Sequence, residues 1–337
     1  MAIDLPFIWA AIIAFAVLAY VILDGFDLGV GILFPFFKQK HDRDVMMNSV
    51  APVWDGNETW LVLGGGGLMA AFPLAYAIVL PALYAPLIAM LLGLVFRGVA
   101  FEFRWRDPAH RKTWDLAFCI GSTVATLAQG ITLGALLQGI AVEGRHYAGG
   151  WWDWLTPFSL LCGASLVIGY AMLGSAWLIW KTEGALQDDA KRLARWLAPA
   201  LIVALGAISL ATPFLEGQYY QRWFAYPGLL VTVPMPLLVA GAGLMLWRGL
   251  ARGPDHAPFL WTLAIFGLSM AGLAISIWPD VVPGRVTIWD AASPHTSQLF
   301  MLVGVAILLP MILAYTAWSY WVFRGKVGDE GYHAHDH

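Results

Sequence analysis

Charged side chains are scarce in this sequence of 337 residues, since Asp, Glu, Lys and Arg together make up 12% of it. A soluble globular domain carries about 25% charged residues, because its surface must be hydrated. Hydrophobic residues reach 60%, and the mean hydropathy is +0.69. These values exclude a soluble protein of this size. We therefore expect an all-α polytopic membrane protein that forms a single membrane domain over residues 1–337.

Cysteines and clusters of basic residues are also rare. The two cysteines, Cys119 and Cys162, both lie in apolar runs, which excludes a disulfide framework and a CxxC redox motif. The formal net charge of −3 and the lack of a basic cluster argue against nucleic-acid binding.

Long apolar runs are abundant, and eight of them are long enough to cross a membrane as helices. They lie at about 7–37, 75–103, 115–138, 157–180, 196–215, 226–247, 258–279 and 298–323. A ninth candidate at about 49–72 is polar in its first half and ends against Pro73. Residues 325–337 form a short polar tail.

The distribution of Lys and Arg decides between eight and nine spans, because these residues accumulate in cytoplasmic loops. With nine spans and an external N-terminus, 16 of the 19 basic residues are cytoplasmic, and only Arg145, Arg222 and Arg285 lie outside. The better eight-span arrangement divides them 13 to 6. We therefore predict nine spans, with a periplasmic N-terminus and a cytoplasmic C-terminus.

Histidine is missing from all of these spans. The eight histidines fall in predicted loops or in the tail: His41, His110, His146, His256, His295, His333, His335 and His337. Haem iron in a membrane bundle is usually held by a helical histidine. The sequence therefore predicts no haem and no other metal bound through ligands of this chain, and no catalytic residue within it.

Four carboxylates are predicted at a similar depth in the cytoplasmic half of the membrane. Asp24 and Asp27 share a face of the first helix, and Asp55 and Glu58 have the same spacing early in the second. Acids at membrane depth are functional by default, so we predict a proton path that uses all four. The alternative for the first pair is a glycine-lined packing seam with two satisfied acids. The alternative for the second pair is that Asp55 and Asn57 cap the start of the second helix.

Two further features accompany the acids. Four consecutive glycines, Gly64 to Gly67, suggest the close approach of a bulky group or of another backbone. Arg97, near the end of the third helix, needs an acid partner if it points inward, and Asp27 or Asp55 lie at the matching depth. The alternative is that Arg97 extends to the lipid headgroups.

Several motifs together resemble subunit II of the cytochrome bd-type quinol oxidases. They are Asp24-Gly25-Phe26-Asp27-Leu28-Gly29-Val30-Gly31, Ala51-Pro52-Val53-Trp54-Asp55-Gly56-Asn57, Phe96-Arg97-Gly98-Val99-Ala100-Phe101-Glu102-Phe103-Arg104 and Tyr315-Thr316-Ala317-Trp318. The chain is similar to the shorter, cyanide-insensitive members, because it has no long insert between its sixth and eighth helices.

The resemblance implies nine helices arranged as two four-helix bundles plus one peripheral helix, in a bacterial inner membrane. It implies a partner, subunit I, that carries two b-type haems and one d-type haem, oxidises quinol and reduces oxygen to water without pumping protons. A structural quinone or lipid, and small single-helix accessory subunits, are further expectations from this resemblance.

The resemblance also implies roles for individual residues. Asp55 matches a proton relay along the subunit interface, helped by Glu58, Asp24 and Asp27. Other positions are expected to support the interface and keep the haems of subunit I in place: Asp27, Trp54, Trp60, Arg97, Glu102 and Asp115. A rival interpretation from another class is an ion-coupled secondary transporter, which also uses buried acids and glycine-interrupted helices.

Overall fold

The computed structural model describes residues 4–215 and 217–327, which are almost entirely helical. The helices are α1 (Leu5–Leu33), η1 (Phe34–Phe36), α2 (Lys40–Val50), α3 (Trp54–Ala71), α4 (Pro73–Ala82), α5 (Tyr84–Arg106), η2 (Pro108–His110), α6 (Arg111–Leu137), α7 (Pro157–Lys181), α8 (Gly184–Ala211), η3 (Thr212–Phe214), α9 (Gly217–Phe224), α10 (Leu229–Thr232), α11 (Pro234–Arg252), α12 (Ala257–Ile277) and α13 (His295–Val322). Two short antiparallel hairpins, β1 (Val142–Glu143) with β2 (His146–Tyr147) and β3 (Asp280–Val282) with β4 (Val286–Thr287), lie in loops.

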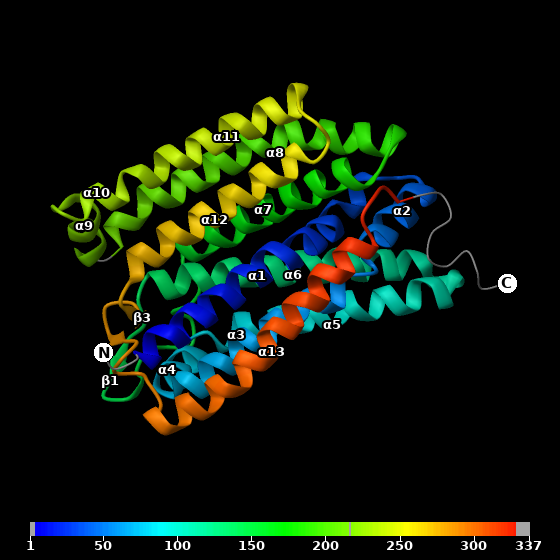
Figure 1. Cartoon of the computed structure of the whole chain (residues 1–337). Coiled ribbons are helices and arrows are strands. Elements are labelled where there is room, and N and C mark those ends of the chain that lie inside the picture. Colours follow the sequence, from blue (N-terminus) through cyan, green and yellow to red (C-terminus); the bar gives the residue numbers. More distant parts are fainter. Residues whose placement is uncertain (1–3, 216, 328–337) are drawn as a thin grey trace.

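Eight helical segments in the described part of the chain are long and apolar enough to cross a membrane. They contain α1, α5, α6, α7, α8, α10 with α11, α12 and α13. The long helices run side by side along a common axis (Figure 1). This confirms the prediction of an all-α polytopic membrane protein.

Helix α1 is enclosed at its C-terminal end, where every residue from Asp24 to Leu33 is buried. Its glycines allow the close approach that the sequence predicted. A Cβ on Gly29 would overlap the backbone carbonyl of Tyr170 on α7. Helices α5 and α6 meet in the same way, since a Cβ on Gly93 would lie 2.7 Å from the carbonyl oxygen of Gly121.

Helix α3 runs antiparallel to α1. A Cβ on Gly67 would lie 3.1 Å from Ile13, and one on Gly64 would lie 3.5 Å from Val17. At the other end of α3, the Asn57 amide donates to the carbonyl of Leu23 at 3.3 Å. Glycines 64 and 67 therefore face α1, whereas nothing lies within 4 Å of a Cβ on glycine 65 or 66.

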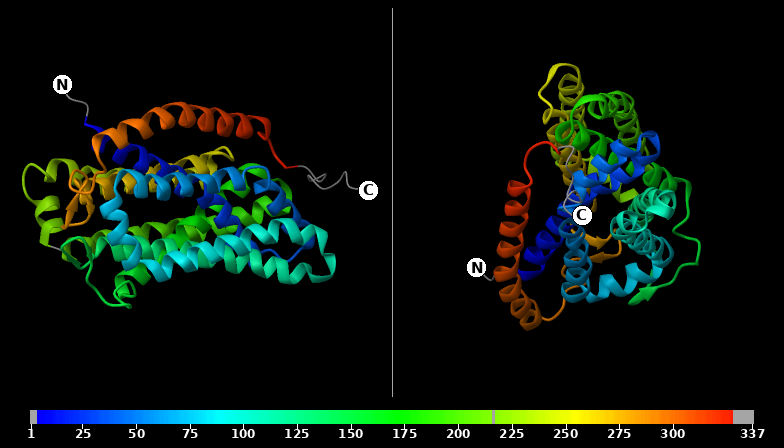
Figure 2. Two further views of the ribbon diagram at one scale, coloured as in Figure 1. Left: turned by 90° about the horizontal axis from the view of Figure 1, so that it is seen from below. Right: turned by 90° about the vertical axis from the view of Figure 1, so that its right-hand side faces the viewer.

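Helix α13 lies on the outside of the molecule. No residue in its most apolar 18-residue window is buried inside the described chain. Seen along the common axis, α13 stands apart from the other long helices (Figure 2). Its apolar surface is thus available to lipid or to another chain.

Two predicted spans are interrupted by proline. The range 75–103 contains α4 and α5, which are separated at Leu83. The range 226–247 contains α10 and α11, which are separated at Val233. Pro86 and Pro234 have no amide hydrogen, so neither can donate to the carbonyl four residues earlier as a continuous helix requires. A hydropathy profile therefore does not distinguish one continuous helix from two helices that are separated near a proline.

Two other predicted ranges have different starting points. The range 49–72 begins as a helix only at Trp54, because residues 49 and 50 end the polar helix α2 and a turn follows. The range 196–215 belongs to α8, which already begins at Gly184, because its first three turns are polar but still helical. Hydropathy identified the apolar part of each helix and missed the polar part.

The predicted tail, 325–337, lies only partly within the described residues. Its first residues contact the bundle, since the amide of Val327 donates to the carbonyl of Lys181 at 2.7 Å. Residues 328–337, which include His333, His335 and His337, lie outside the described residues.

Candidate functional site

The buried carboxylates of α1 form the centre of the site. Asp24 and Asp27 are fully buried and lie on the same face of the helix as Tyr20. One oxygen of each aspartate, Asp24 Oδ2 and Asp27 Oδ1, has no hydrogen-bond partner among the described residues. The glycine seam itself is present, on the side of α1 that faces α7.

Arg97 of α5 links two acids from different helices. Its guanidinium contacts Asp24 Oδ1 at 2.5 Å and Glu58 Oε2 at 2.7 Å. The Arg97 side chain is 0% exposed, whereas Glu58 is 29% exposed. The extension of Arg97 to the headgroups is therefore wrong. The predicted partners of Arg97 were Asp27 or Asp55, whereas its observed partners are Asp24 and Glu58. The antiparallel packing of α3 on α1 brings Asp24 and Glu58 together.

Asp27 is held by an amide. Asn57 Nδ2 donates to Asp27 Oδ2 at 2.7 Å, and the Tyr320 hydroxyl of α13 donates to Asn57 Oδ1 at 2.9 Å. Val53 is the N-cap of α3 and makes no side-chain capping bond. Neither Asp55 nor Asn57 is therefore the N-cap of this helix, as the alternative interpretation required.

A second polar chain continues from Tyr20 toward α7. Gln129 Nε2 donates to the Tyr20 hydroxyl at 2.7 Å, and the Tyr170 hydroxyl donates to Gln129 Oε1 at 2.9 Å. The buried polar network therefore extends across α1, α6 and α7. These three residues are not predictable from the sequence, because isolated Tyr and Gln residues in apolar runs resemble ordinary packing.

Asp55 differs from the other three acids because it is exposed at the start of α3. Its neighbour Trp54 stacks on Phe101 with a ring-centroid distance of 4.7 Å and also lies under the Arg97 guanidinium at 5.8 Å. Trp60 is 2% exposed and packs edge-on against Phe15. These contacts hold the start of α3 against α5 and α1.

The remaining predicted residues lie apart from this network. Glu102 is 60% exposed and pairs only weakly with Arg106, at 3.5 Å. Asp115 belongs to a separate ion cluster between α2, α5 and α6. Its oxygens contact Arg104 Nε at 2.5 Å and Arg43 NH1 at 2.9 Å.

Asp44 completes that cluster by bridging two arginines. It contacts Arg104 NH1 at 2.8 Å and Arg111 NH2 at 2.7 Å. In the sequence alone, these basic residues were interpreted only as charges of a cytoplasmic loop. A signal was present for Arg104, which follows Arg97 by seven residues and therefore lies on the same buried face of α5.

Side chains that commonly bind metals do not gather in the described part of the chain. Among these residues, no set of three or more His, Cys, Asp or Glu side chains could hold a metal ion. The histidines within residues 4–327 are all exposed: His41, His110, His146, His256 and His295. Each lies at or beyond the end of a long helix, and none faces the interior.

Comparison with known proteins identifies the family. The model of the family described as cytochrome bd terminal oxidase subunit II matches residues 5–323. The chain is 30% identical to cytochrome bd-I ubiquinol oxidase subunit 2 of Escherichia coli K12, over 99% of this chain and 98% of that protein. It is 28% identical to cytochrome bd ubiquinol oxidase subunit 2 of Bacillus subtilis, over 95% and 96% of the two chains.

A solved structure shows the same fold. A chain in the bd oxidase structure from Geobacillus thermodenitrificans superposes with a TM-score of 0.79, over 95% of this chain and 99% of that one, at 17% sequence identity. The family match and the full-length relatives agree with the motifs found in the sequence. This chain therefore belongs to the cytochrome bd terminal oxidase subunit II family.

Proposed function

We propose that this chain is subunit II of a quinol oxidase of a bacterial inner membrane. In that complex it supports a haem-bearing subunit I and contributes a cytoplasmic proton path for the reduction of oxygen to water. Family membership over residues 5–323 supports the oxidase assignment. The observation that carries the proton path is a buried carboxylate network that reaches the surface of the chain near Asp55.

The haems belong to the partner in this proposal. The described histidines of this chain are exposed at the ends of its helices, so they do not fit haem ligation within the bundle. We infer that two b-type haems and one d-type haem lie in subunit I, together with the sites for quinol and oxygen. A structural quinone or lipid and small single-helix accessory subunits remain expectations from the family resemblance.

We further infer nine spans, with α3 as the ninth. Its 18 residues give a length of about 27 Å at 1.5 Å per residue, close to the hydrocarbon thickness of a bilayer. Its antiparallel contacts with α1 support a full crossing. The proposed arrangement has two four-helix bundles, with α13 as the peripheral helix, an external N-terminus and a cytoplasmic C-terminus.

One face of α3 is suited to contact subunit I. Residues spaced three or four apart on this helix are exposed: Asp55, Thr59, Val62, Gly66 and Met69. Val62 is 73% exposed although the chain around it is apolar. The open glycines 65 and 66 lie on or beside this face, where another helix can approach closely. Asp55 would then lie in the subunit interface.

Protons would enter at Asp55 and pass to Glu58, one turn further along α3. Glu58 and Asp24 share Arg97, and Asp27 lies beside them through Asn57. Three carboxyls with a single guanidinium carry an excess of negative charge, and the open oxygens of Asp24 and Asp27 are atoms that can accept a proton. The arrangement is that of a proton relay.

The substitution Asp55→Asn tests this route, because asparagine keeps the size of the side chain but cannot carry a proton between water and Glu58. Steady-state oxygen consumption should fall by about 100-fold or more, the scale of one lost proton-transfer group. Reduction of the haems by quinol without oxygen should remain close to normal. The matched control is Asp189→Asn, an exposed acid on α8 that is remote from the network.

Unchanged oxygen turnover in the Asp55→Asn complex with intact haems would remove Asp55 from the route. A loss of haem content or of assembly, with normal turnover per haem, would instead assign it a structural role.

The transporter alternative is tested by purification through this chain: an oxidase subunit brings an unlike partner and haem absorbance, whereas a transporter remains colourless.

A further inference from the structure

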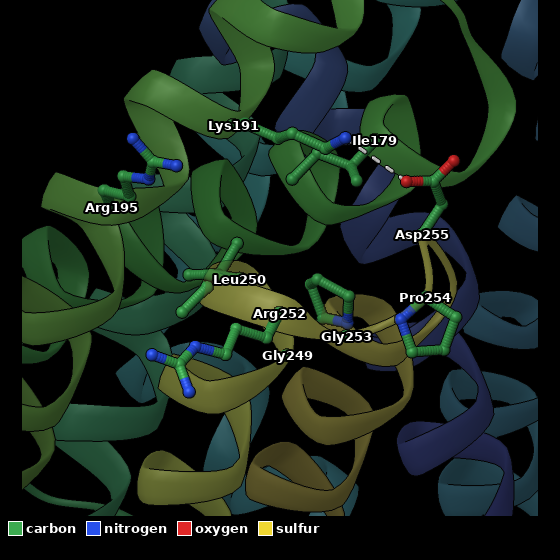
Figure 3. Close-up of a pocket in the computed structure, with 11 residues that line it drawn as sticks. Ile179, Lys191, Arg195, Gly249, Leu250, Arg252, Gly253, Pro254 and Asp255 are labelled. Carbon is green, nitrogen blue, oxygen red and sulfur yellow. Dashed lines mark ion pairs between the residues drawn. The ribbon is translucent and has the colours of Figure 1, made fainter.

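A cavity of about 200 Å³ lies far from the carboxylate network, between the start of α8, the end of α11 and the loop that leads into α12. This volume is below the range of about 300–1,000 Å³ that is typical of sites for larger ligands and cofactors. Its charged lining residues are Lys191, Arg195, Arg252 and Asp255 (Figure 3). Three cations therefore face a single acid.

The one acid of the cavity is already paired. Asp255 Oδ2 accepts from Lys326 Nζ at 2.8 Å and from Gln187 Nε2 at 2.9 Å, and Asp255 Oδ1 lies 3.3 Å from Lys191 Nζ. The hydrogen bond from Lys326, with those from Gln187 and Lys191, lowers the pKa of Asp255 to about 2. Asp255 is therefore an ionised, fully engaged partner of the two lysines.

The two arginines have no such partner. Among the described residues, the side chains of Arg195 and Arg252 have no hydrogen bond and no ion pair, and both residues are exposed. Figure 3 shows them on one side of the cavity and the Lys191–Asp255 pair on the other. Two guanidinium groups at the mouth of a polar cavity form a site for an anion with several acceptor oxygens, such as a phosphate.

The surroundings place this cavity at the level of lipid headgroups. Trp196 follows Arg195 directly and is 78% exposed, and Trp247 on α11 is 51% exposed. Exposed tryptophans near the ends of membrane helices are typical of the headgroup region. Basic pockets between membrane helices on the cytoplasmic side bind anionic headgroups, and the orientation proposed above makes this side cytoplasmic.

We propose that this cavity is a binding site for the phosphate of an anionic phospholipid of the cytoplasmic leaflet. Arg195 and Arg252 bind the phosphate oxygens, while the paired Lys191 and Asp255 form the opposite side of the cavity. The site is separate from the carboxylate network, so it would exist whether or not that network carries protons.

The test uses the assembled oxidase purified in detergent and analysed by native mass spectrometry. The complex is titrated with phosphatidylglycerol or phosphatidylcholine of identical acyl chains. The wild type should retain phosphatidylglycerol preferentially. The double substitution Arg195→Gln with Arg252→Gln should weaken that binding about 30-fold, from two basic residues near the membrane surface. Its haem spectrum and its turnover in neutral detergent should stay unchanged.

The matched control is Arg192→Gln. This arginine lies on the same helix and is 74% exposed, but it pairs with Asp189 and does not line the cavity. Its complex should bind phosphatidylglycerol as the wild type does. The charge-conserving double variant Arg195→Lys with Arg252→Lys should keep most of the preference, because both positive charges remain. The unchanged haem spectrum of the double glutamine variant checks that its complex is folded.

Three results would overturn the proposal. The first is equal phosphatidylglycerol binding by the wild type and the double glutamine variant. The second is an equal loss in the Arg192→Gln control, which would indicate general surface charge. The third is binding of added inorganic phosphate at this cavity with no preference between the two lipids, which would assign the site to the free ion.

Discussion

At the residue scale, Arg97 determines the charge balance of the interior. It is the only basic group that contacts a buried aspartate, Asp24, among the described residues, and it also holds Glu58. Its own Nε has no partner in the described chain. Burial of an ion pair is costly in itself, but the loss of one partner costs more, because the other charge then remains buried and unpaired.

Arg97→Gln should therefore destabilise the subunit by about 3–5 kcal/mol, the typical cost of breaking a buried pair from one side. We expect a low yield of assembled oxidase and a lower melting temperature of the complex that does form. Arg106→Gln is the control, because this side chain is 76% exposed and pairs weakly on the same helix. Similar yields for the two variants would contradict the prediction.

At the element scale, backbone contact between α1 and α7 brings the network together. Gly29 and Gly174 face each other across this contact, and a Cβ on either would overlap the partner backbone. The same contact brings Tyr170 to Gln129 and thus connects α7 to Tyr20 of α1. If an added methyl group pushed α1 and α7 apart, it would weaken both the backbone contact and the hydrogen-bond chain from Tyr170 to Tyr20.

Gly29→Ala should destabilise the complex by about 1–3 kcal/mol, at the upper end of this range because the clash is with backbone. The measurement is thermal denaturation of the purified complex. Gly206→Ala in α8 is the matched control, since nothing lies within 4 Å of its added Cβ and alanine favours a helix. A normal melting temperature for Gly29→Ala would show that α1 and α7 can separate freely.

The contact between α8, the α11–α12 loop and the segment after α13 is pH-dependent through Asp255. Its folded-state pKa is lowered from 3.8 to about 2, first by the hydrogen bond from Lys326. Its ionised form therefore contributes stability that is present above about pH 4 and is lost as the pH falls toward about 2. The melting temperatures of wild type and Asp255→Asn should differ at neutral pH and converge over this range. A difference in melting temperature that stays constant with pH would contradict this assignment. Asp189→Asn is the control for the general loss of an acidic side chain.

At the scale of the whole molecule, the basic residues and the acid network both support the orientation proposed above. The ends of α5, α7 and α11 and the start of α6 carry eight of the 19 Lys and Arg residues, and all lie at the end of the molecule where α3 begins (Figure 1). The start of α3 carries Asp55 and Glu58. The proposed orientation therefore opens the carboxylate network toward the cytoplasm, the side from which protons for water would come.

Single-cysteine labelling tests this orientation. Arg145→Cys in the β1–β2 turn should react with a membrane-impermeant maleimide in intact cells, because the proposed orientation puts this turn on the external side. Lys112→Cys at the start of α6 should react only after the cells are opened. Both positions are exposed, and the native Cys119 and Cys162 lie within helices α6 and α7. The reverse pattern of labelling would invert the orientation.

Several elements of the fold were predictable because they depend on local composition. The apolar runs identified the eight long segments, and the glycines around Asp24 predicted a close helix contact. The proline breaks at Leu83 and Val233 were missed, because proline interrupts hydrogen bonding without lowering hydropathy. The polar helix α2 and the polar start of α8 were missed for the opposite reason, since they are helical but not apolar.

The sequence by itself determined the membrane class, the depth of the acids and the family motifs, because scarce charge and long apolar runs have a direct energetic meaning in a bilayer. Only the tertiary structure decided which charges meet. Spacing along a helix placed Asp24, Asp27 and Arg97 at similar depths, but the antiparallel register of α3 on α1 selected Glu58 and Asn57 as their partners. Depth follows from position in one helix, whereas pairing depends on the rotation and register of two helices, which are set by packing of the whole bundle.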